Sequence, residues 1–288
     1  MTAKKIILNI HLWLGLASGL VVVILGITGC LLAFETEIRS ITEPQQYAEV
    51  ENKPYLPPSV LKAEAEKYLD GKKINGIEYP GKGKAAIASY YDAENYKLVA
   101  INPYSGKILK VKNMNRDFFR IVLNGHYYLW LPEKIGQPIV ASSTLIFLIM
   151  LITGLVLWWP KNKAARKQRF SIKWNAKWRR VNYDLHNVLG FYMTWIAIFI
   201  TITGLVFGFE WFARSFYWVT SGGNAFVEEV HPVSDTLLAK NKTGNVADQV
   251  WLTMSAQKKE KEGIGLYYPL TNTDSAGGDD QSPPRYLL

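Results

Sequence analysis

Two segments of the chain, 175 positions apart, carry the same sequence pattern. The pattern H-x-x-L-G-x11-I-T-G-x4-F-E fits, without a gap, the segment that begins at His11 and the segment that begins at His186. An internal repeat constrains the fold more than any local feature, because it indicates that the chain is built from two copies of one unit. Almost every residue within the pattern is apolar, so the repeat also places a histidine at the same point of two hydrophobic segments. Ionisable side chains in such segments usually serve a function.

Three segments are apolar and long enough to cross a bilayer, which takes about 20 residues. We predict spans over residues 6–35, 138–159 and 185–212, and the second span carries an I-T-G motif of its own at Ile152 to Gly154. The sequence therefore predicts a membrane α-helical bundle in contact with the lipid bilayer.

The loop between the second and third spans fixes the expected orientation. Within the loop 160–184, nine Lys and Arg residues precede Asp184, with no acid among them. Short basic loops stay in the cytoplasm, so the N-terminus and this loop are expected on the cytoplasmic side, and segments 36–137 and 213–288 on the other side. The formal net charge of +9 is then mostly a topology signal, and we expect no nucleic-acid partner.

Segment 36–137 is expected to hold a small α+β module. A helix is predicted from Val60 to Leu69, because prolines precede it and Gly71 follows it. Apolar stretches separated by turn residues predict an antiparallel meander after that helix. These stretches are 74–77, 85–91, 96–101 and 107–111.

The turn Asn102–Lys107, with the sequence N-P-Y-S-G-K, resembles the closing turn of a PepSY domain. Set between spans that begin with H-x-x-x-G and end with T-G, the module is similar to that of the PepSY-associated transmembrane family of bacterial inner membranes. The segment N-G-H-Y-Y-L-W at 124–130 and W-W-P at 158–160 fit the same family. The resemblance implies an inner-membrane location and, in family members, a fourth span after a second PepSY module. Some members are haem-binding ferric-siderophore reductases, and others are known only as iron-regulated membrane proteins.

The end of the chain departs from that pattern. The repeat would place a fourth span at about 314–334, beyond Leu288. Gly263–Pro269 and Arg285–Leu288 resemble strands, so we interpret 213–288 as a partial second PepSY-like module and expect four spans in the complete protein. A natural three-span protein is the alternative.

His11 and His186 begin spans that run in the same direction, so they are expected at similar depth near the cytoplasmic face. Gly15 and Gly190 follow one helical turn later on the same helix faces. Two imidazoles can hold the iron of haem b while the glycines leave room for the macrocycle. Ligation by two histidines leaves no open iron position and favours electron transfer. The alternative is that each histidine is an interfacial group and each glycine a notch for helix packing.

Two further histidines lie outside the repeated pattern. His126 precedes the second span, and its repeat counterpart would be at position 301, so it is a candidate ligand of a second, outer haem or else a plain interfacial residue. His231 has no counterpart in the repeat and is expected to be structural.

Glu35 and Glu210 end the first and third spans at equivalent positions. We expect each to mark the water interface and to pair with an arginine four residues later, Arg39 or Arg214. A metal site or a proton relay is the alternative. The repeated Thr-Gly pairs are expected only to let helices approach closely.

The sequence contains no dinucleotide-binding motif, P-loop, metalloprotease motif or nucleophile elbow. Two functional classes remain. The first is a carrier with one or two haem b groups that moves electrons outward from an unidentified donor to a ferric siderophore or another iron chelate, releasing the iron by reduction. The second is a non-enzymatic, membrane-anchored binding or regulatory protein. An absorption spectrum of the purified protein separates the two classes.

Overall fold

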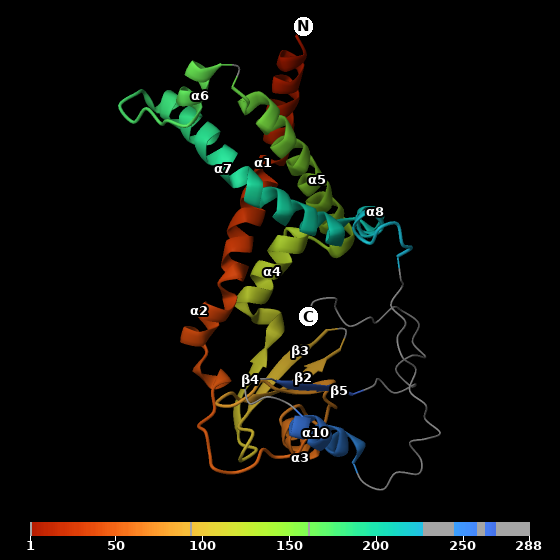
Figure 1. Ribbon diagram of the computed structural model, residues 1–288. Helices are drawn as coiled ribbons and strands as arrows, with labels where there is room; N and C mark the ends of the chain where they lie inside the picture. Colours follow the sequence, from red (N-terminus) through yellow and green to blue (C-terminus); the bar gives the residue numbers. More distant parts are fainter. Residues whose placement is uncertain (1, 93, 161, 227–244, 258–262, 269–288) are drawn as a thin grey trace. The chain divides into compact units, whose positions relative to one another are not determined.

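The computed structural model describes residues 2–92, 94–160, 162–226, 245–257 and 263–268 (Figure 1). Clustering of contacts divides the chain into two compact units. The helical unit consists of Met1–Ala33 and Ile121–His231, and the sheet unit consists of Phe34–Arg120 and Pro232–Leu288.

Among the described residues, three helices of the helical unit are long and apolar enough to cross a membrane, which confirms the three predicted spans. They are α1 (Ala3–Ala33), α5 (Glu133–Trp158) and α7 (Trp178–Gly208). Helix α5 packs against both α1 and α7. Helices α1 and α7 have 31 residues each, and both ends of α7 lie 175 positions after the corresponding ends of α1. The helix ends therefore follow the offset of the sequence pattern.

The helix ends also differ from the apolar runs on which the predicted spans were based. Helix α5 begins at Glu133 rather than 138, and α7 begins at Trp178 rather than 185, because charged residues end an apolar run without ending a helix. Helix α7 stops before Phe209, and a separate helix, α8 (Glu210–Thr220), follows. At the other boundary, residues 121–137 belong to the helical unit and not to the α+β module.

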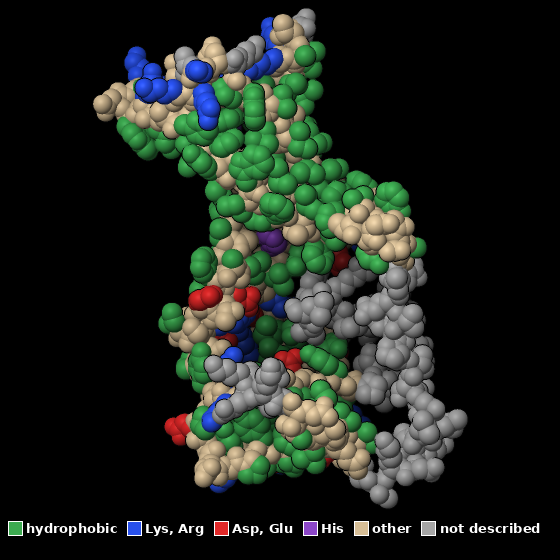
Figure 2. Space-filling model, in the orientation of Figure 1, with side chains coloured by type: hydrophobic (Ala, Val, Ile, Leu, Met, Phe, Trp, Pro, Cys, Tyr) green, Lys and Arg blue, Asp and Glu red, His purple; other side chains and the backbone are tan. Residues whose placement is uncertain are grey.

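The large apolar side chains of α1 point out of the protein, and its small polar side chains point inward. Leu16 and Leu20 are 72% and 74% exposed, whereas Ser18 and Thr28 are buried. Because lipid tails are as apolar as leucine, helices in a bilayer gain by close packing and by hydrogen bonds between helices. Hydrophobic side chains cover this unit in Figure 2, and Lys and Arg side chains gather at its end near the N-terminus and α6 (Lys163–Arg169).

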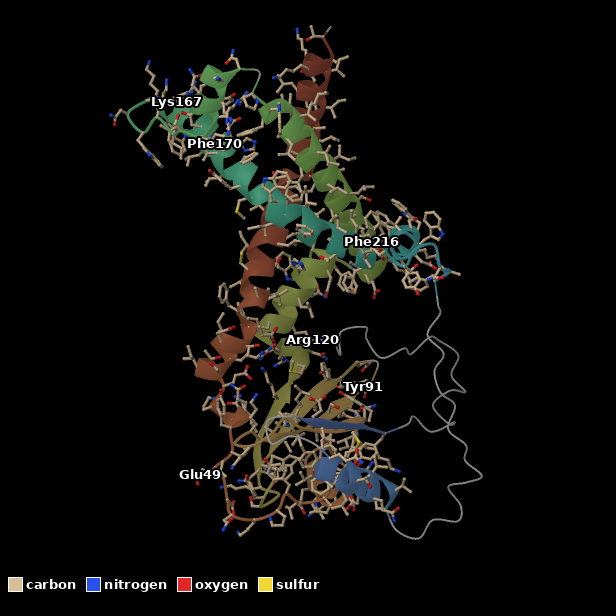
Figure 3. The ribbon with its side chains drawn as sticks, in the orientation of Figure 1. Glu49, Tyr91, Arg120, Lys167, Phe170 and Phe216 are labelled. Atoms are coloured by element: carbon tan, nitrogen blue, oxygen red, sulfur yellow. The ribbon has the colours of Figure 1, made fainter. Side chains whose placement is uncertain are left out.

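The basic loop between α5 and α7 folds onto the first turns of α7. The rings of Trp158 and Phe191 stack with centroids 4.0 Å apart, and Phe170 meets Trp158 edge-on at 5.1 Å. Asp184 is buried and accepts hydrogen bonds from the Arg180 side chain and the Lys173 backbone. Figure 3 shows Lys167 and Phe170 at this end of the helical unit and Phe216, on α8, at the other end.

A tight left-handed turn joins α4 (Phe118–Tyr128) to α5. Leu129 and Trp130 have φ angles of 55° and 57°, which are uncommon for residues other than glycine. The Trp130 indole donates a hydrogen bond to the Ile121 carbonyl at 2.9 Å and lies over Gly125, where an added Cβ would approach the ring to 2.3 Å. Gly125 is therefore needed for the indole to close this turn.

The sheet unit contains the predicted helix and antiparallel meander. Its helix α3 (Pro58–Lys67) covers a sheet with the strand order β4-β3-β2-β1-β5, in which every neighbouring pair is antiparallel. Side chains of β2 alternate between buried and half-buried, as a sheet with one covered face requires. The remaining elements are α2 (Glu35–Thr42), η1 (Pro44–Gln46), β1 (Gly76–Tyr79), β2 (Ala86–Tyr91), β3 (Tyr96–Ile101), β4 (Ile108–Asn113) and η2 (Met114–Arg116).

The described part of segment 213–288 differs from the expected second module. Strand β5 (Ile264–Tyr267) pairs with β1, with Leu266 opposite Ile77, so it extends the first sheet. Helix α10 (Val246–Gln257) packs beside α3. A single sheet results because β1 would otherwise be an edge with unpaired backbone groups. The expected strand at 285–288 lies outside the described residues.

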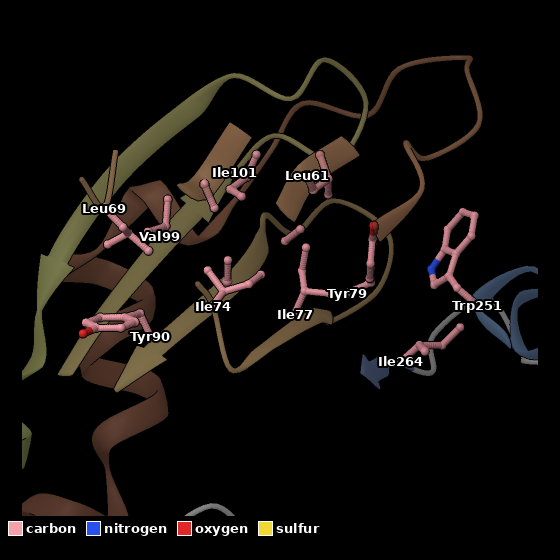
Figure 4. Close-up of a cluster of buried hydrophobic side chains, with 13 residues drawn as sticks. Leu61, Leu69, Ile74, Ile77, Tyr79, Tyr90, Val99, Ile101, Trp251 and Ile264 are labelled. Atoms are coloured by element: carbon pink, nitrogen blue, oxygen red, sulfur yellow. The ribbon is translucent and has the colours of Figure 1, made fainter. Parts of the chain in front are cut away.

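Helix α10 also completes the core of the sheet unit (Figure 4). Trp251 is buried and its ring lies 5.4 Å from that of Tyr79. Asp248 accepts hydrogen bonds from the backbone N–H and the hydroxyl of Ser59, in the first turn of α3. The segment that follows the last span is therefore part of the module that precedes the second span.

A network of charged side chains ties α2 to the end of the meander. Asp117 is buried and pairs with Arg39 and with Lys112, each at 2.5 Å. Arg39 also pairs with Glu35 at 2.6 Å, which confirms that predicted pair. The equivalent predicted pair of Glu210 with Arg214, at 2.7 Å, is confirmed too.

Replacing Trp251, which lies on α10, should lower the stability of the sheet as well as that of α10. We expect Trp251→Ala to lower the stability of the sheet unit by about 3–5 kcal/mol, because a buried aromatic side chain leaves a cavity. Hydrogen exchange of the β1 amides, in the full chain in detergent, should then become faster. Leu252→Ala is the matched control, since Leu252 is 60% exposed; equal effects of both substitutions would show that α10 does not dock on the core.

The Asp117 network should make the sheet unit sensitive to acid. Burial opposes ionisation of Asp117, but hydrogen bonds from Arg39 and Lys112 outweigh it and lower the pKa of Asp117 to about 2. Because this folded pKa is below the unfolded one, the stabilisation is complete above about pH 4 and is lost as the pH falls through 2. It amounts to roughly 2 kcal/mol.

Urea unfolding at pH values between 7 and 2, with proteolysis as the probe of the sheet unit, measures the free energy of unfolding. Asp117→Asn should be less stable than the unsubstituted protein at pH 7. Its free energy of unfolding should also fall by less between pH 7 and pH 2. The exposed substitution Asp70→Asn should change stability by less than about 0.5 kcal/mol at pH 7. An acid profile of Asp117→Asn identical to that of the unsubstituted protein would contradict the assignment.

Candidate functional site: two histidines between α1 and α7

The structure brings His11 and His186 together within the helical unit. Their ring centroids are 6.5 Å apart, and their ring planes make an angle of 69°. Each histidine is the ninth residue of its 31-residue helix. Two helices of equal length thus present imidazoles to one another from equivalent positions.

The separation of the two rings fits one metal ion between them. A metal–imidazole bond is about 2 Å long, and the ring centre lies roughly 1 Å beyond the nitrogen, so two imidazoles on opposite sides of one iron have centroids about 6 Å apart. Among the residues that the structure describes, no group of three or more His, Cys, Asp or Glu side chains is arranged to hold a metal ion. A haem needs only two such side chains, since the porphyrin supplies the other ligands.

The two glycines of the predicted site differ in their surroundings. A Cβ added to Gly190 would meet no atom within 4 Å, so the space beside it is open. A Cβ added to Gly15 would come within 2.8 Å of the Met150 Cε atom. Gly15 therefore lies where α5 packs against α1, whereas the space beside Gly190 is open.

Helix α5 holds His11 through residues that the sequence analysis assigned to packing alone. The His11 Nδ1 atom lies 2.9 Å from the Thr153 hydroxyl oxygen. The neighbouring Gly154 lies beside the ring, where an added Cβ would be in ordinary contact, 3.4 Å from the His11 Cε1 atom. The signal was present in the sequence: I-T-G also occurs in the second span, which has no H-x-x-x-G of its own.

His126 makes the same kind of contact at the other end of α1. Its Nδ1 atom lies 2.9 Å from the Thr28 hydroxyl oxygen, and an added Cβ on Gly29 would lie 3.2 Å from its Cε1 atom. Thr28 follows His11 by 17 residues on one helix, which is roughly 25 Å along the axis. The structure thus separates His126 from the pair, and His231 lies outside the described residues.

The sheet unit has an open cavity of about 480 Å³ that the sequence analysis did not predict. Tyr55 and Tyr104 meet there edge-on, with ring centroids 4.9 Å apart. The cavity has aromatic rings and charged groups of both signs, and Lys53 pairs there with Glu51 at 2.9 Å. Its lining residues are Val50, Glu51, Asn52, Lys53, Tyr55, Lys82 and Tyr104.

Within the described residues, these features define a membrane protein with three helices long enough to span a bilayer and with paired histidines on α1 and α7. Its α+β unit is assembled from a segment before α5 and a segment after α7. The chain belongs to the family described as the PepSY-associated TM region, whose sequence model matches residues 8–277. The match extends from the first turns of α1 past the end of β5, so it covers both units. It confirms the resemblance drawn from the sequence motifs. A comparison with curated proteins found no match.

Proposed function

We propose that this protein is a haem b electron carrier of the bacterial inner membrane. The observation that carries the proposal is the pair of imidazoles from His11 and His186, 6.5 Å apart between two spanning helices. A pair of ionisable side chains at matched positions in a lipid-exposed bundle is costly unless it serves a function such as holding a ligand. Haem, when bound, supplies one-electron chemistry.

The residues of the site have distinct tasks in this proposal. His11 and His186 would both hold the iron, which would leave no open position for oxygen or a substrate. The open side of Gly190 would admit the macrocycle, and Met150 would have to yield beside Gly15, which a flexible thioether side chain can do. The site would therefore relay electrons rather than bind a substrate.

A second haem is part of the proposal. His126, roughly 25 Å from His11 along α1, is its candidate ligand. Two haems near opposite ends of one helix would form a path through the bilayer.

Iron uptake is the expected purpose of this electron path. Fe(III) held by the hard oxygen ligands of a siderophore or another chelate is released on reduction, because Fe(II) binds such ligands less strongly. The electron donor would be a separate protein or a quinol, since the sequence contains no dinucleotide-binding motif.

The cavity of the sheet unit favours a second candidate function. Its tyrosines and Lys82, beside the ion pair of Lys53 with Glu51 at 2.9 Å, would bind a peptide or chelate without any redox step. The protein would then be a membrane-anchored binding or regulatory protein. The presence or absence of haem separates the two functions.

The purified full chain should show a Soret band and a sharp α-band on reduction. His11→Ala and His186→Ala should each remove the low-spin signal of the inner haem, because one imidazole holds haem poorly, and His126→Ala should leave that signal intact. Gly190→Leu should block the macrocycle, whereas Gly26→Leu is the matched control, since Gly26 also has no neighbour within 4 Å. Full haem content in the double variant His11→Ala/His186→Ala would show that this pair does not hold the haem, and absence of haem from the unsubstituted protein would favour the binding function.

The proposed direction of electron flow requires a defined topology. A reporter fused after Arg180 should be cytoplasmic, and reporters fused after Tyr55 or Asn224 should be on the other side of the membrane, because the basic loop stays inside. Reporter activity in inverted and right-side-out vesicles provides the measurement. An external Arg180 fusion would reverse the orientation and with it the proposed outward path.

A further inference from the structure

Two histidines of the helical unit are held by the same three-part contact, although the contacts involve different helix pairs. His11 of α1 meets Thr153 and Gly154 of α5, and His126 of α4 meets Thr28 and Gly29 of α1. In both contacts the Nδ1-to-hydroxyl distance is 2.9 Å, and the Thr-Gly pair belongs to an I-T-G motif.

The threonine proton determines which imidazole nitrogen carries hydrogen. The Thr153 hydroxyl donates to the Ile149 carbonyl at 2.9 Å, and the Thr28 hydroxyl donates to the Ile24 carbonyl at 2.7 Å. A carbonyl can only accept, and a hydroxyl has a single proton. A threonine that keeps its proton on the carbonyl can only accept from the imidazole, which makes the Nδ1–H of the histidine the donor.

The consequence concerns the other ring nitrogen. In a neutral imidazole with hydrogen on Nδ1, Nε2 carries the free lone pair. A hydrogen bond from the remote N–H also fixes the orientation of a ligating ring and raises the basicity of the ligand nitrogen. Gly29 contributes by allowing the His126 ring to come close to the hydroxyl, since an added Cβ would lie 3.2 Å from it.

We infer that Thr153 and Thr28 are positioning residues, which hold His11 and His126 in the tautomer that presents Nε2 to iron. The inference rests on the proposed haem function and deepens it, because it assigns a task to I-T-G beyond helix packing. In this role, the I-T-G motif of one helix positions a histidine of a neighbouring helix.

The third I-T-G of the chain provides the control. The Thr203 hydroxyl donates to the Ile200 carbonyl at 2.8 Å, and within the described residues no histidine contacts it. Gly204 faces the Thr144 side chain instead. Thr203→Val therefore removes an equivalent hydroxyl from an equivalent motif without touching an imidazole.

The first measurement uses the full chain loaded with haem. Thr153→Val should weaken binding of the inner haem by about 10- to 100-fold and raise its midpoint potential, because a less basic imidazole stabilises Fe(III) less. Thr153→Ser should restore both values, and Thr203→Val should leave them unchanged. Haem affinity and potential of Thr153→Val equal to those of the unsubstituted protein would overturn the inference while leaving the haem function intact.

The second measurement needs no haem. In the haem-free full chain, nitrogen-15 NMR of labelled histidine should show His11 and His126 with hydrogen on Nδ1. Thr153→Val should convert His11 to a mixture of tautomers and leave His126 unchanged, and Thr28→Val should do the reverse. If His11 carried its hydrogen on Nε2 in the unsubstituted protein, the inference would be wrong whether or not the protein binds haem.

Discussion

The absence of water inside a bilayer is the constraint on which the helical unit depends. A polar group there must find its partner within the protein, and the buried hydroxyls do so in their own helices: Ser18 donates to the Leu14 carbonyl, and Thr201 donates to the Ala197 carbonyl. A threonine bonded in this way still has lone pairs to offer. His11 and His126 use them, so the partner of each imidazole comes from a neighbouring helix. A threonine that is hydrogen-bonded within its own helix thereby determines where a histidine of a neighbouring helix can be accommodated.

Much of this architecture could be predicted from the sequence because it depends on local or periodic features. An apolar run of sufficient length predicts a span, and a repeat with a fixed offset predicts that His11 and His186 stand at equal positions of parallel helices. The pairing of Glu35 with Arg39 follows from helical spacing alone. Each of these features requires only the rise and turn of a helix.

The remaining features depend on how elements meet, which no local pattern specifies. The rotation of α5 about its axis decides that Thr153 faces His11 and that Met150 fills the space at Gly15. The edge at which β5 joins the sheet depends on β1 being free to pair, so a strand expected to begin a second module extends the first. The core contact between Trp251 and Tyr79 stabilises that arrangement, and neither residue indicates its partner in the sequence.

The pairing of β5 with β1 has a consequence for how the protein is made. Leu266 lies opposite Ile77, 189 positions earlier in the chain. At a synthesis rate of about 5–20 residues per second, β1 waits roughly 10–40 s for its partner on the ribosome. During that interval α5 and α7 must enter the membrane while β1 remains an open edge, to which another chain could pair. Completion of the sheet therefore has to follow the synthesis of α5 and α7, and a ribosome that stalls within α7 would leave a nascent chain with an unprotected strand.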